Sequence, residues 1–213
     1  MNENTDNNFA SEQGTQKPAT EKLGPMARLR RFLKSNSDMI VKLYVHQFGL
    51  TVFGYLLYSA ASASGNKPLV FGLGIFSAIF YLILLYVLSW DVGARDKIRI
   101  DGGRLERDIF KGAKVTLVGM APNLVIALIS LTGYVLRGVG AWANGLYGIA
   151  QIVGVFLNSM YLGIDEYTTF STSPLYLFVI CLPAIAVCGF GYALGTYEKL
   201  GVLTSVGNKS KKR

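Results

Sequence analysis

Charged residues are scarce in this chain, and they are unevenly placed. They make up 16% of its 213 residues and hydrophobic residues make up 51%, whereas about a quarter of a typical soluble domain is charged. Five long stretches contain no Asp, Glu, Lys or Arg: Leu43–Asn66, Pro68–Trp90, Val115–Leu136, Gly138–Ile164 and Tyr167–Tyr197. A soluble fold cannot bury that much apolar length, so an ordinary soluble globular domain is excluded.

Residues that carry catalytic or metal-binding chemistry are also few. His46 is the only histidine, so a histidine metal triad is excluded, and no His-Glu-x-x-His motif occurs. The expected membrane spans hold no Asp or Glu, which argues against a carrier driven by protons or sodium ions. Cys181 and Cys188 lie about 10 Å apart along a helix, too far for a disulfide, and should pack as small apolar side chains. We therefore expect no catalytic residue, no metal site and no cofactor.

The apolar stretches predict an all-α integral membrane protein. A membrane-spanning helix needs about 20 apolar residues, because each residue rises about 1.5 Å across roughly 30 Å of hydrocarbon. The expected bundle has four transmembrane helices, with a turn at 64–68 pairing the first two as an antiparallel hairpin. These spans are residues 43–63, 69–90, 115–136 and 175–197. Residues 145–162 are shorter and more polar, so we expect a re-entrant or interfacial helix there, with a fifth transmembrane helix as the alternative.

The basic residues indicate the orientation of the chain. Seven Lys or Arg precede the first span, seven lie in residues 91–114 and five follow the last span, whereas only Lys67 and Arg137 lie elsewhere. With four spans, all three groups face the cytoplasm, as the positive-inside rule favours; five spans would move the last five outside. We therefore expect a plasma membrane or bacterial inner membrane protein whose two termini are cytoplasmic.

Three regions follow from this topology. Residues 1–38 form a disordered cytoplasmic tail with a basic amphipathic end. Residues 39–198 form the transmembrane domain, including a cytoplasmic loop at 91–114, and residues 199–213 form a basic cytoplasmic tail. Basic residues beside a bilayer are expected to contact anionic lipid headgroups or a protein partner, and we expect no nucleic acid. The candidate contact residues are Arg28, Arg30, Arg31, Arg95, Lys97, Arg99, Arg104, Arg107 and Lys111.

The cytoplasmic loop has a local pattern of its own. Lys97–Ile100 alternates polar and apolar residues and is followed by Asp101-Gly102-Gly103, which predicts a small hairpin. Leu105, Ile109 and Ala113 recur at helical spacing and predict a juxtamembrane helix before the third span. The alternating Asp and Arg residues of the loop are interpreted as ion pairs within it.

Part of the same loop resembles a known enzyme signature. Asp91, Ala94 and Arg95 can be aligned with the start of the CDP-alcohol phosphotransferase motif. That family transfers phospholipid headgroups within the membrane and holds divalent metal ions with its carboxylates, so the resemblance implies a metal-dependent headgroup transferase. The chain departs from the motif where Val92 replaces a glycine and Arg107 replaces an aspartate.

Polar residues in the apolar stretches suggest a path or a set of packing contacts. Asn144, Gln151, Asn158 and Asp165 recur every seven residues and would form one stripe on a straight helix. The stripe is either the lining of a polar path, the wet face of an outer-surface helix, or a set of interhelical hydrogen bonds. The candidate path residues are His46, Asn123, Gln151, Asn158 and Asp165.

Two prolines interrupt expected spans. Pro122 and Pro183 would each free a backbone carbonyl four residues earlier, at Val118 and Val179. Paired broken helices at membrane depth are typical of transporters. Proline is also common in membrane helices, so kinks that serve packing are the simpler interpretation.

The function expected from these observations is a non-enzymatic accessory, scaffold or regulatory membrane component. Its basic loop would meet anionic lipid or a protein partner. Gly74-x-x-x-Ala78 and Gly191-x-x-x-Gly195 permit close helix approach, either within one chain or in a homo-oligomer. The alternative is a small transporter or channel subunit with a polar path along Asn123, Gln151 and Asn158, and the headgroup transferase is a distant third.

Overall fold

The computed structural model describes residues 24–168, 173 and 175–197, which are mostly helical and include no strand. The chain separates into two compact units, Met1–Ser35 and Asn36–Arg213. In the first unit, the described residues begin helix α1 (Pro25–Ala63) and carry the exposed side chains of Arg28, Arg30 and Arg31. The basic end of the expected tail is therefore helical, whereas residues 1–23 and 198–213 lie outside the described residues.

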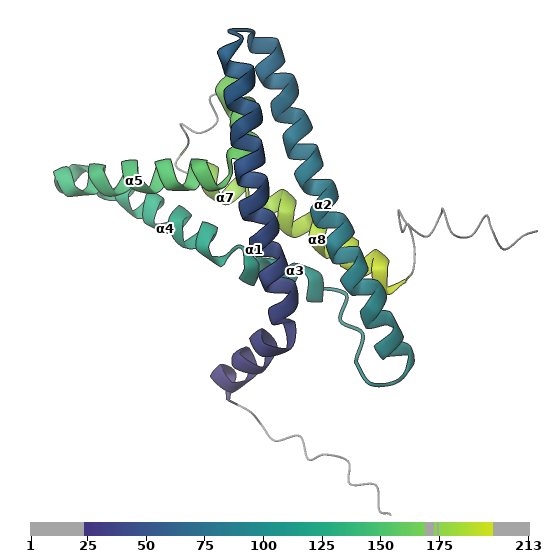
Figure 1. Ribbon diagram of the computed structural model, residues 1–213. Coiled ribbons are helices and arrows are strands. Elements are labelled where there is room, and N and C mark those ends of the chain that lie inside the picture. Colours follow the sequence, from purple (N-terminus) through teal and green to yellow (C-terminus); the bar gives the residue numbers. More distant parts are fainter. Residues whose placement is uncertain (1–23, 169–172, 174, 198–213) are drawn as a thin grey trace, which may run out of the picture. The chain divides into compact units, whose positions relative to one another are not determined.

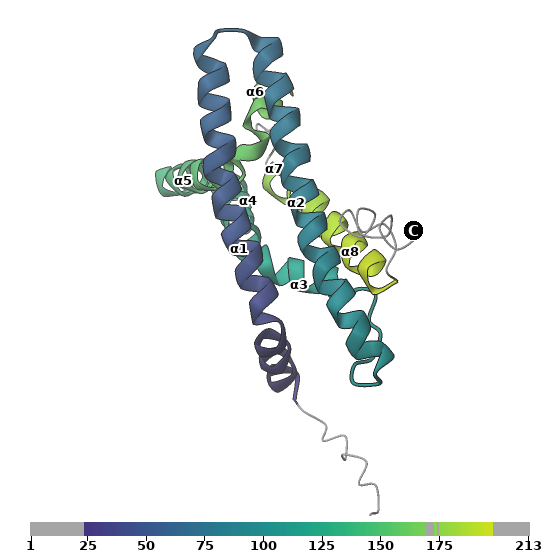
Figure 2. The same cartoon turned by 45° about the vertical axis from the view of Figure 1, so that its right-hand side comes forward.

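In the second unit, α1 and α2 (Lys67–Asp101) form an antiparallel pair (Figures 1 and 2). Gly65 in the turn has φ +66°, a left-handed conformation that glycine adopts without strain. Asn66 caps α2 by accepting a hydrogen bond from the Leu69 amide at 3.4 Å. The Phe53 and Phe80 rings pack 5.4 Å apart across the pair. The predicted turn between the first two spans is confirmed.

Helix α2 continues well beyond the expected end of the second span. Its 35 residues make about 52 Å of helix, which exceeds the roughly 30 Å hydrocarbon layer. The hairpin predicted at Lys97–Ile100 is wrong, because these residues form the last turns of α2. Ion pairs four residues apart, Asp91–Arg95 and Lys97–Asp101, support a helix at this point. The segment between helices is therefore residues 102–110, shorter than the expected loop at 91–114.

The third expected span is two helices, α3 (Lys111–Gly119) and α4 (Ala121–Val135), followed by the short helix η1 (Leu136–Gly138). Pro122 lies in the first turn of α4 instead of inside a helix. The first turn needs no hydrogen bond from this residue, so the missing N–H costs little there. The predicted interruption is confirmed, and it separates two helices at Met120.

The last expected span is also divided, into α7 (Tyr176–Val179) and α8 (Leu182–Thr196). Pro183 again lies in the first turn of the second helix. Both prolines therefore begin helices in this structure.

The segment that was expected to be re-entrant or interfacial is sharply bent. Helix α5 (Ala141–Leu157) is followed by η2 (Ser159–Tyr161) and α6 (Leu162–Thr168), and the two parts meet at 76°. The single stripe predicted for a straight helix is therefore wrong, because Asp165 lies beyond the bend. By length and apolar character, four helical segments of the described chain can cross a membrane, and the bent pair would be a fifth if it counts as one span.

Helix α8 packs along the C-terminal half of α2 and runs parallel to it (Figure 2). Cys188 lies against Leu85, and Gly191 against Tyr86, so positions along both helices increase in the same direction. A methyl group on Gly191 would come within 2.8 Å of the Tyr86 carbonyl oxygen. The Gly191-x-x-x-Gly195 face is thus used for close packing within the chain.

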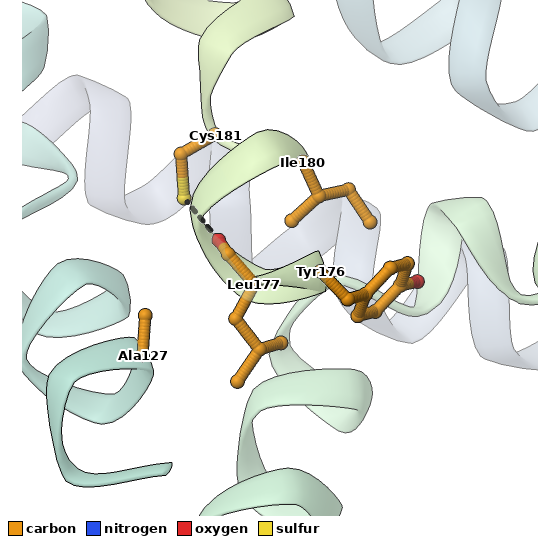
Figure 3. Close-up of a cluster of buried hydrophobic side chains, with 5 residues drawn as sticks. All are labelled: Ala127, Tyr176, Leu177, Ile180 and Cys181. Atoms are coloured by element: carbon orange, nitrogen blue, oxygen red, sulfur yellow. Dashed lines mark hydrogen bonds between the residues drawn. The ribbon is translucent and has the colours of Figure 1, made fainter. Parts of the chain in front are cut away.

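Helices α4 and α5 form a second antiparallel pair. Gly133 of α4 lies against the Tyr147 backbone of α5. A cluster of buried apolar side chains packs α4 against the α7 region, as Figure 3 shows; its members are Ala127, Tyr176, Leu177, Ile180 and Cys181. Cys181 and Cys188 are both buried and unbridged, which confirms that they pack as small apolar residues.

Candidate functional site

A buried carboxylate joins three helices near the C-terminal end of α2. Asp96 is only 3% exposed. Its Oδ2 accepts hydrogen bonds from Lys111 Nζ of α3 at 2.5 Å and from the Tyr192 hydroxyl of α8 at 2.9 Å, while Oδ1 lies 3.4 Å from Arg99 Nη1. The Lys111 ammonium also lies 5.9 Å from the centre of the Tyr192 ring. We call these four residues the Asp96 cluster; its two cations compensate the buried negative charge.

Most other charges between Asp91 and Lys114 are also paired locally. Three further ion pairs are Asp91–Arg95, Lys97–Asp101 at 2.7 Å and Asp108–Lys114 at 2.7 Å. The Arg107 guanidinium lies 4.9 Å from the centre of the Tyr197 ring, and Arg104 is exposed. The predicted ion pairs within this segment are confirmed, and they leave Asp91 and Asp108 each bound to its own cation.

Side chains of α1 and α2 hold the end of α5, where the chain bends. The Leu157 carbonyl oxygen, exposed by the end of the helix, accepts hydrogen bonds from Gln47 Nε2 and Thr51 Oγ1, both at 2.7 Å. The Tyr81 hydroxyl donates to Gln47 Oε1 at 2.7 Å. Because α5 ends at Leu157, this carbonyl oxygen has no N–H of a following helical turn to bond, and the side chains of Gln47 and Thr51 take that place.

The residues after the bend are tied to the same part of α1. Ser159 donates its hydroxyl to the Thr51 carbonyl oxygen, and Asn158 Nδ2 donates back to the Gly154 carbonyl oxygen at 2.8 Å. Gly54 has the Met160 backbone directly beside it, so no larger residue fits there without movement. Hydrogen bonds and close backbone packing therefore join the bend to α1.

A cavity of about 260 Å³ lies beside this junction. Two helix interruptions meet at it: the start of α4 and the end of α5. We call it the amide cavity, after the Gln47 and Asn123 carboxamides in its wall; its lining is Tyr44, Gln47, Phe48, Gly119, Pro122, Asn123 and Leu157. Asn123 is only 7% exposed, and its amide makes one hydrogen bond among the described residues, from Nδ2 to Met120 Sδ at 3.5 Å.

The predicted path residues lie in separate places. Asn123 lines the amide cavity, and Asn158 lies next to Leu157 at the bend. Gln151 Nε2 donates to the Tyr147 hydroxyl at 3.0 Å on α5, and Asp165 is buried in α6. The hydrogen bonds of Asn123, Gln151 and Asn158 are local, to residues three or four positions earlier in the sequence.

His46 lies outside the amide cavity. Its Nδ1 is 2.8 Å from the Lys42 carbonyl oxygen. It lines a second cavity of about 260 Å³ together with residues of α2 that include Trp90 and Asp91. The structure therefore separates His46 from Asn123, although both were assigned to one path from the sequence.

Four important residues were not identified from the sequence: Gln47, Thr51, Tyr81 and Asp96. Gln47 and Thr51 are four residues apart in an apolar helix, and this spacing was an available signal for one polar face. Asp96 had no such signal, because its partners lie 15 and 96 residues away.

Among the described residues, no group of three or more His, Cys, Asp or Glu side chains is placed to hold a metal ion. Comparison of the chain with protein-family models, curated protein sequences and solved structures found no match. The likeness to the headgroup transferases therefore rests on Asp91, Ala94 and Arg95 alone.

Proposed function

We propose that the chain is an integral membrane protein with four transmembrane helices. The main support is the number of large apolar side chains that the fold leaves uncovered. Examples from four helices are Val45, Ile79, Leu128 and Phe190, each more than half exposed. This many exposed large apolar side chains are unfavourable in water and favourable in lipid.

We further propose that both termini are cytoplasmic. The parallel packing of α8 and α2 supports this, because parallel spans cross the membrane in the same direction. If α2 enters the cytoplasm at its basic end, α8 does so as well. The chain between α2 and α8 then crosses the membrane only once, through α4. Five spans would require α8 to run antiparallel to α2.

The bent segment then enters and leaves the membrane on the outer side. The end of α5 lies beside Gln47 and Thr51, within the first span. From there α6 returns to the outer end of α2, where Gly163 packs on Gly74 and the Tyr167 ring lies 4.7 Å from Phe71. This course supports a re-entrant segment in preference to a fifth span.

The function that we propose is that of a non-enzymatic scaffold or accessory component. It presents a basic surface on the cytoplasmic side, which we call the cytoplasmic platform (Asp91–Lys114). The single observation that carries this proposal is the Asp96 cluster, because it fixes the end of α2 to α3 and α8. A fixed surface keeps its charges in one arrangement, which is what recognition of a specific partner requires.

The platform extends beyond the lipid headgroups. Trp90 marks an interface position, and Arg99 lies nine residues further along α2, about 13 Å. Each headgroup layer is only about 5–8 Å thick. The Arg99 side chain is 68% exposed, and Arg104 and Arg107 are also exposed. We therefore propose a protein partner with an acidic surface.

Purification in mild detergent tests this function. We expect a stoichiometric protein partner to copurify with the wild type and to be lost from the double variant Arg104→Glu, Arg107→Glu, which leaves the Asp96 cluster intact. Lys67→Glu, at the opposite end of α2, is the charge-reversal control and should keep the partner. Retention of the partner by the double variant, or copurification of anionic lipid alone, would contradict the proposal.

A small transporter is the second candidate function, and the amide cavity is the observation that favours it. Two broken helices meet there at membrane depth, as they do at transporter binding sites. Loss of flux through reconstituted vesicles after Asn123→Leu, with normal assembly, would support transport. Unchanged flux would remove this candidate.

A further inference from the structure

The wall of the amide cavity is apolar with two neutral polar groups. Tyr44, Phe48, Pro122 and Leu157 contribute mainly apolar surface, and the carboxamides of Gln47 and Asn123 contribute the polar groups. Among the residues that the structure describes, the lining contains no Asp, Glu, Lys, Arg or His. A charged molecule would have to give up its hydration without a counter-charge, which is very unfavourable away from water.

The two carboxamides differ in how far their hydrogen-bonding capacity is used. Gln47 both donates, to Leu157, and accepts, from Tyr81. Asn123 makes only one bond, to the thioether of Met120, which is a weak acceptor. Its oxygen and its second N–H have no partner among the described residues, and the residue as a whole is 7% exposed. Since Asn123 lines the cavity, these two groups are available to hydrogen-bond a molecule there.

Two aromatic rings of α1 form an exposed part of the cavity wall. Phe48 and Tyr44 lie in its wall and are also 64% and 39% exposed. These two rings are four residues apart, so they stand on one face of the helix. In the proposed membrane location, a molecule dissolved in the bilayer would therefore meet the wall of the cavity at these two rings.

We propose that the amide cavity binds an uncharged, largely apolar molecule that carries a hydroxyl group or a primary or secondary amide group. That group exchanges hydrogen bonds with the unused oxygen and N–H of Asn123, while the apolar part lies against Phe48 and Leu157. The inference rests on the proposed membrane location, but it depends on neither the scaffold role nor transport. The same chemistry is available from a neutral membrane lipid or from a small dissolved amide.

A ligand that binds only the folded protein raises its thermal unfolding midpoint, and the concentration dependence gives the affinity. The purified full-length protein is titrated in mild detergent with monoolein, hexanamide and oleate. Monoolein represents the neutral lipid, hexanamide the dissolved amide, and oleate is a charged control with the same chain as monoolein. We expect one or both uncharged probes to raise the midpoint and oleate to have a much smaller effect. The more effective uncharged probe identifies the source of the ligand.

Variants test whether the effect depends on the cavity. Asn123→Leu should weaken binding of the uncharged probe about tenfold, the equivalent of one or two lost hydrogen bonds. Asn123→Gln keeps the carboxamide and should restore part of the affinity. Asn144→Leu, which removes an exposed carboxamide on α5, should bind like the wild type. If Asn123→Leu does not fold, Phe48→Ala replaces it, because this exposed ring contributes to the cavity wall; a several-fold loss is expected.

Three results would overturn the inference: no response of the wild type to either uncharged probe, an equal response to oleate and monoolein, or an unchanged affinity in both Asn123→Leu and Phe48→Ala. Failure of the membrane location is distinguishable from these, because it appears before any probe is added. In that case the protein would stay monodisperse in buffer without detergent.

Discussion

The Tyr192 hydroxyl of α8 donates a 2.9 Å hydrogen bond to Asp96 Oδ2 of α2, the same oxygen that binds Lys111 of α3. One carboxylate therefore joins three helices that are far apart in the sequence. The contact lies six residues beyond Trp90, where the second span was expected to end, and it holds the C-terminal end of α2 against α3 and α8. The glycines of α8 bring the helix backbones close enough for this bond to form.

Replacing Asp96 by Asn should destabilise the protein markedly. The substitution leaves the largely buried Lys111 ammonium without its counter-charge, which costs about 3 kcal/mol when one partner of a buried pair is removed. For a chain of this size we expect the thermal unfolding midpoint in detergent to fall by roughly 5–10 °C. Asp101→Asn breaks the half-exposed pair with Lys97 and should shift the midpoint by less than about 2 °C. Equal shifts in the two variants would contradict the structural role of Asp96.

Replacing Gly195 by Ala should disturb the packing of α8 on α2. The added methyl group would overlap the Trp90 carbonyl oxygen and come within 3.0 Å of the Ala94 amide nitrogen, and backbone atoms cannot move aside cheaply. We expect a loss of about 1–3 kcal/mol, measured as a lower unfolding midpoint. Gly72→Ala is the control, because nothing lies within 4 Å of its added methyl and alanine favours the helix. A stable Gly195→Ala protein would mean that the two helices are further apart than described.

The distribution of charged residues along the sequence predicted the helical fold and four long apolar segments, because charge-free stretches can be read directly from the sequence. The turn at Gly65 and Asn66 was also predictable, since both residues have strong local preferences. The prediction of a hairpin at Lys97–Ile100 was wrong for a local reason. Four alternating residues span about one helical turn, so this pattern is too short to separate a strand from a helix end.

The candidate site was harder to predict, because its geometry depends on contacts between distant residues. Polar residues that recur every seven positions form one stripe only on a straight helix. The helix bends at Asn158, so the predicted stripe does not form. The amide cavity forms where Gln47 meets two helix ends, which no local pattern specifies. Asn123 was identified because an amide inside an apolar stretch is unusual in any fold.

The double substitution Gln47→Leu with Thr51→Val should destabilise the bend at the end of α5. Both donors to the Leu157 carbonyl oxygen are lost, so an acceptor in an apolar environment is left without a partner. We expect a cost of about 2–3 kcal/mol and faster hydrogen exchange in α5 and α6.

A control variant shows whether the loss of stability comes from the junction or from removing a threonine hydroxyl anywhere in the protein. Thr132 of α4 donates to the Leu128 carbonyl oxygen of its own helix and is exposed. Thr132→Val should therefore change stability by less than about 0.5 kcal/mol. If exchange in α5 and α6 were as slow in the double variant as in the wild type, the junction would not depend on α1.

Cysteine labelling distinguishes four spans from five. Cys181 and Cys188 are buried and can be replaced by Ala, which leaves a protein without thiols. A cysteine introduced at Glu166, an exposed position of α6, should react with a membrane-impermeant maleimide in intact cells, because a re-entrant segment returns to the outer side. A cysteine at Arg104 should react only after permeabilisation. If position 166 were protected until permeabilisation, α5 and α6 would cross the membrane as one span, and the parallel packing of α8 on α2 would be impossible.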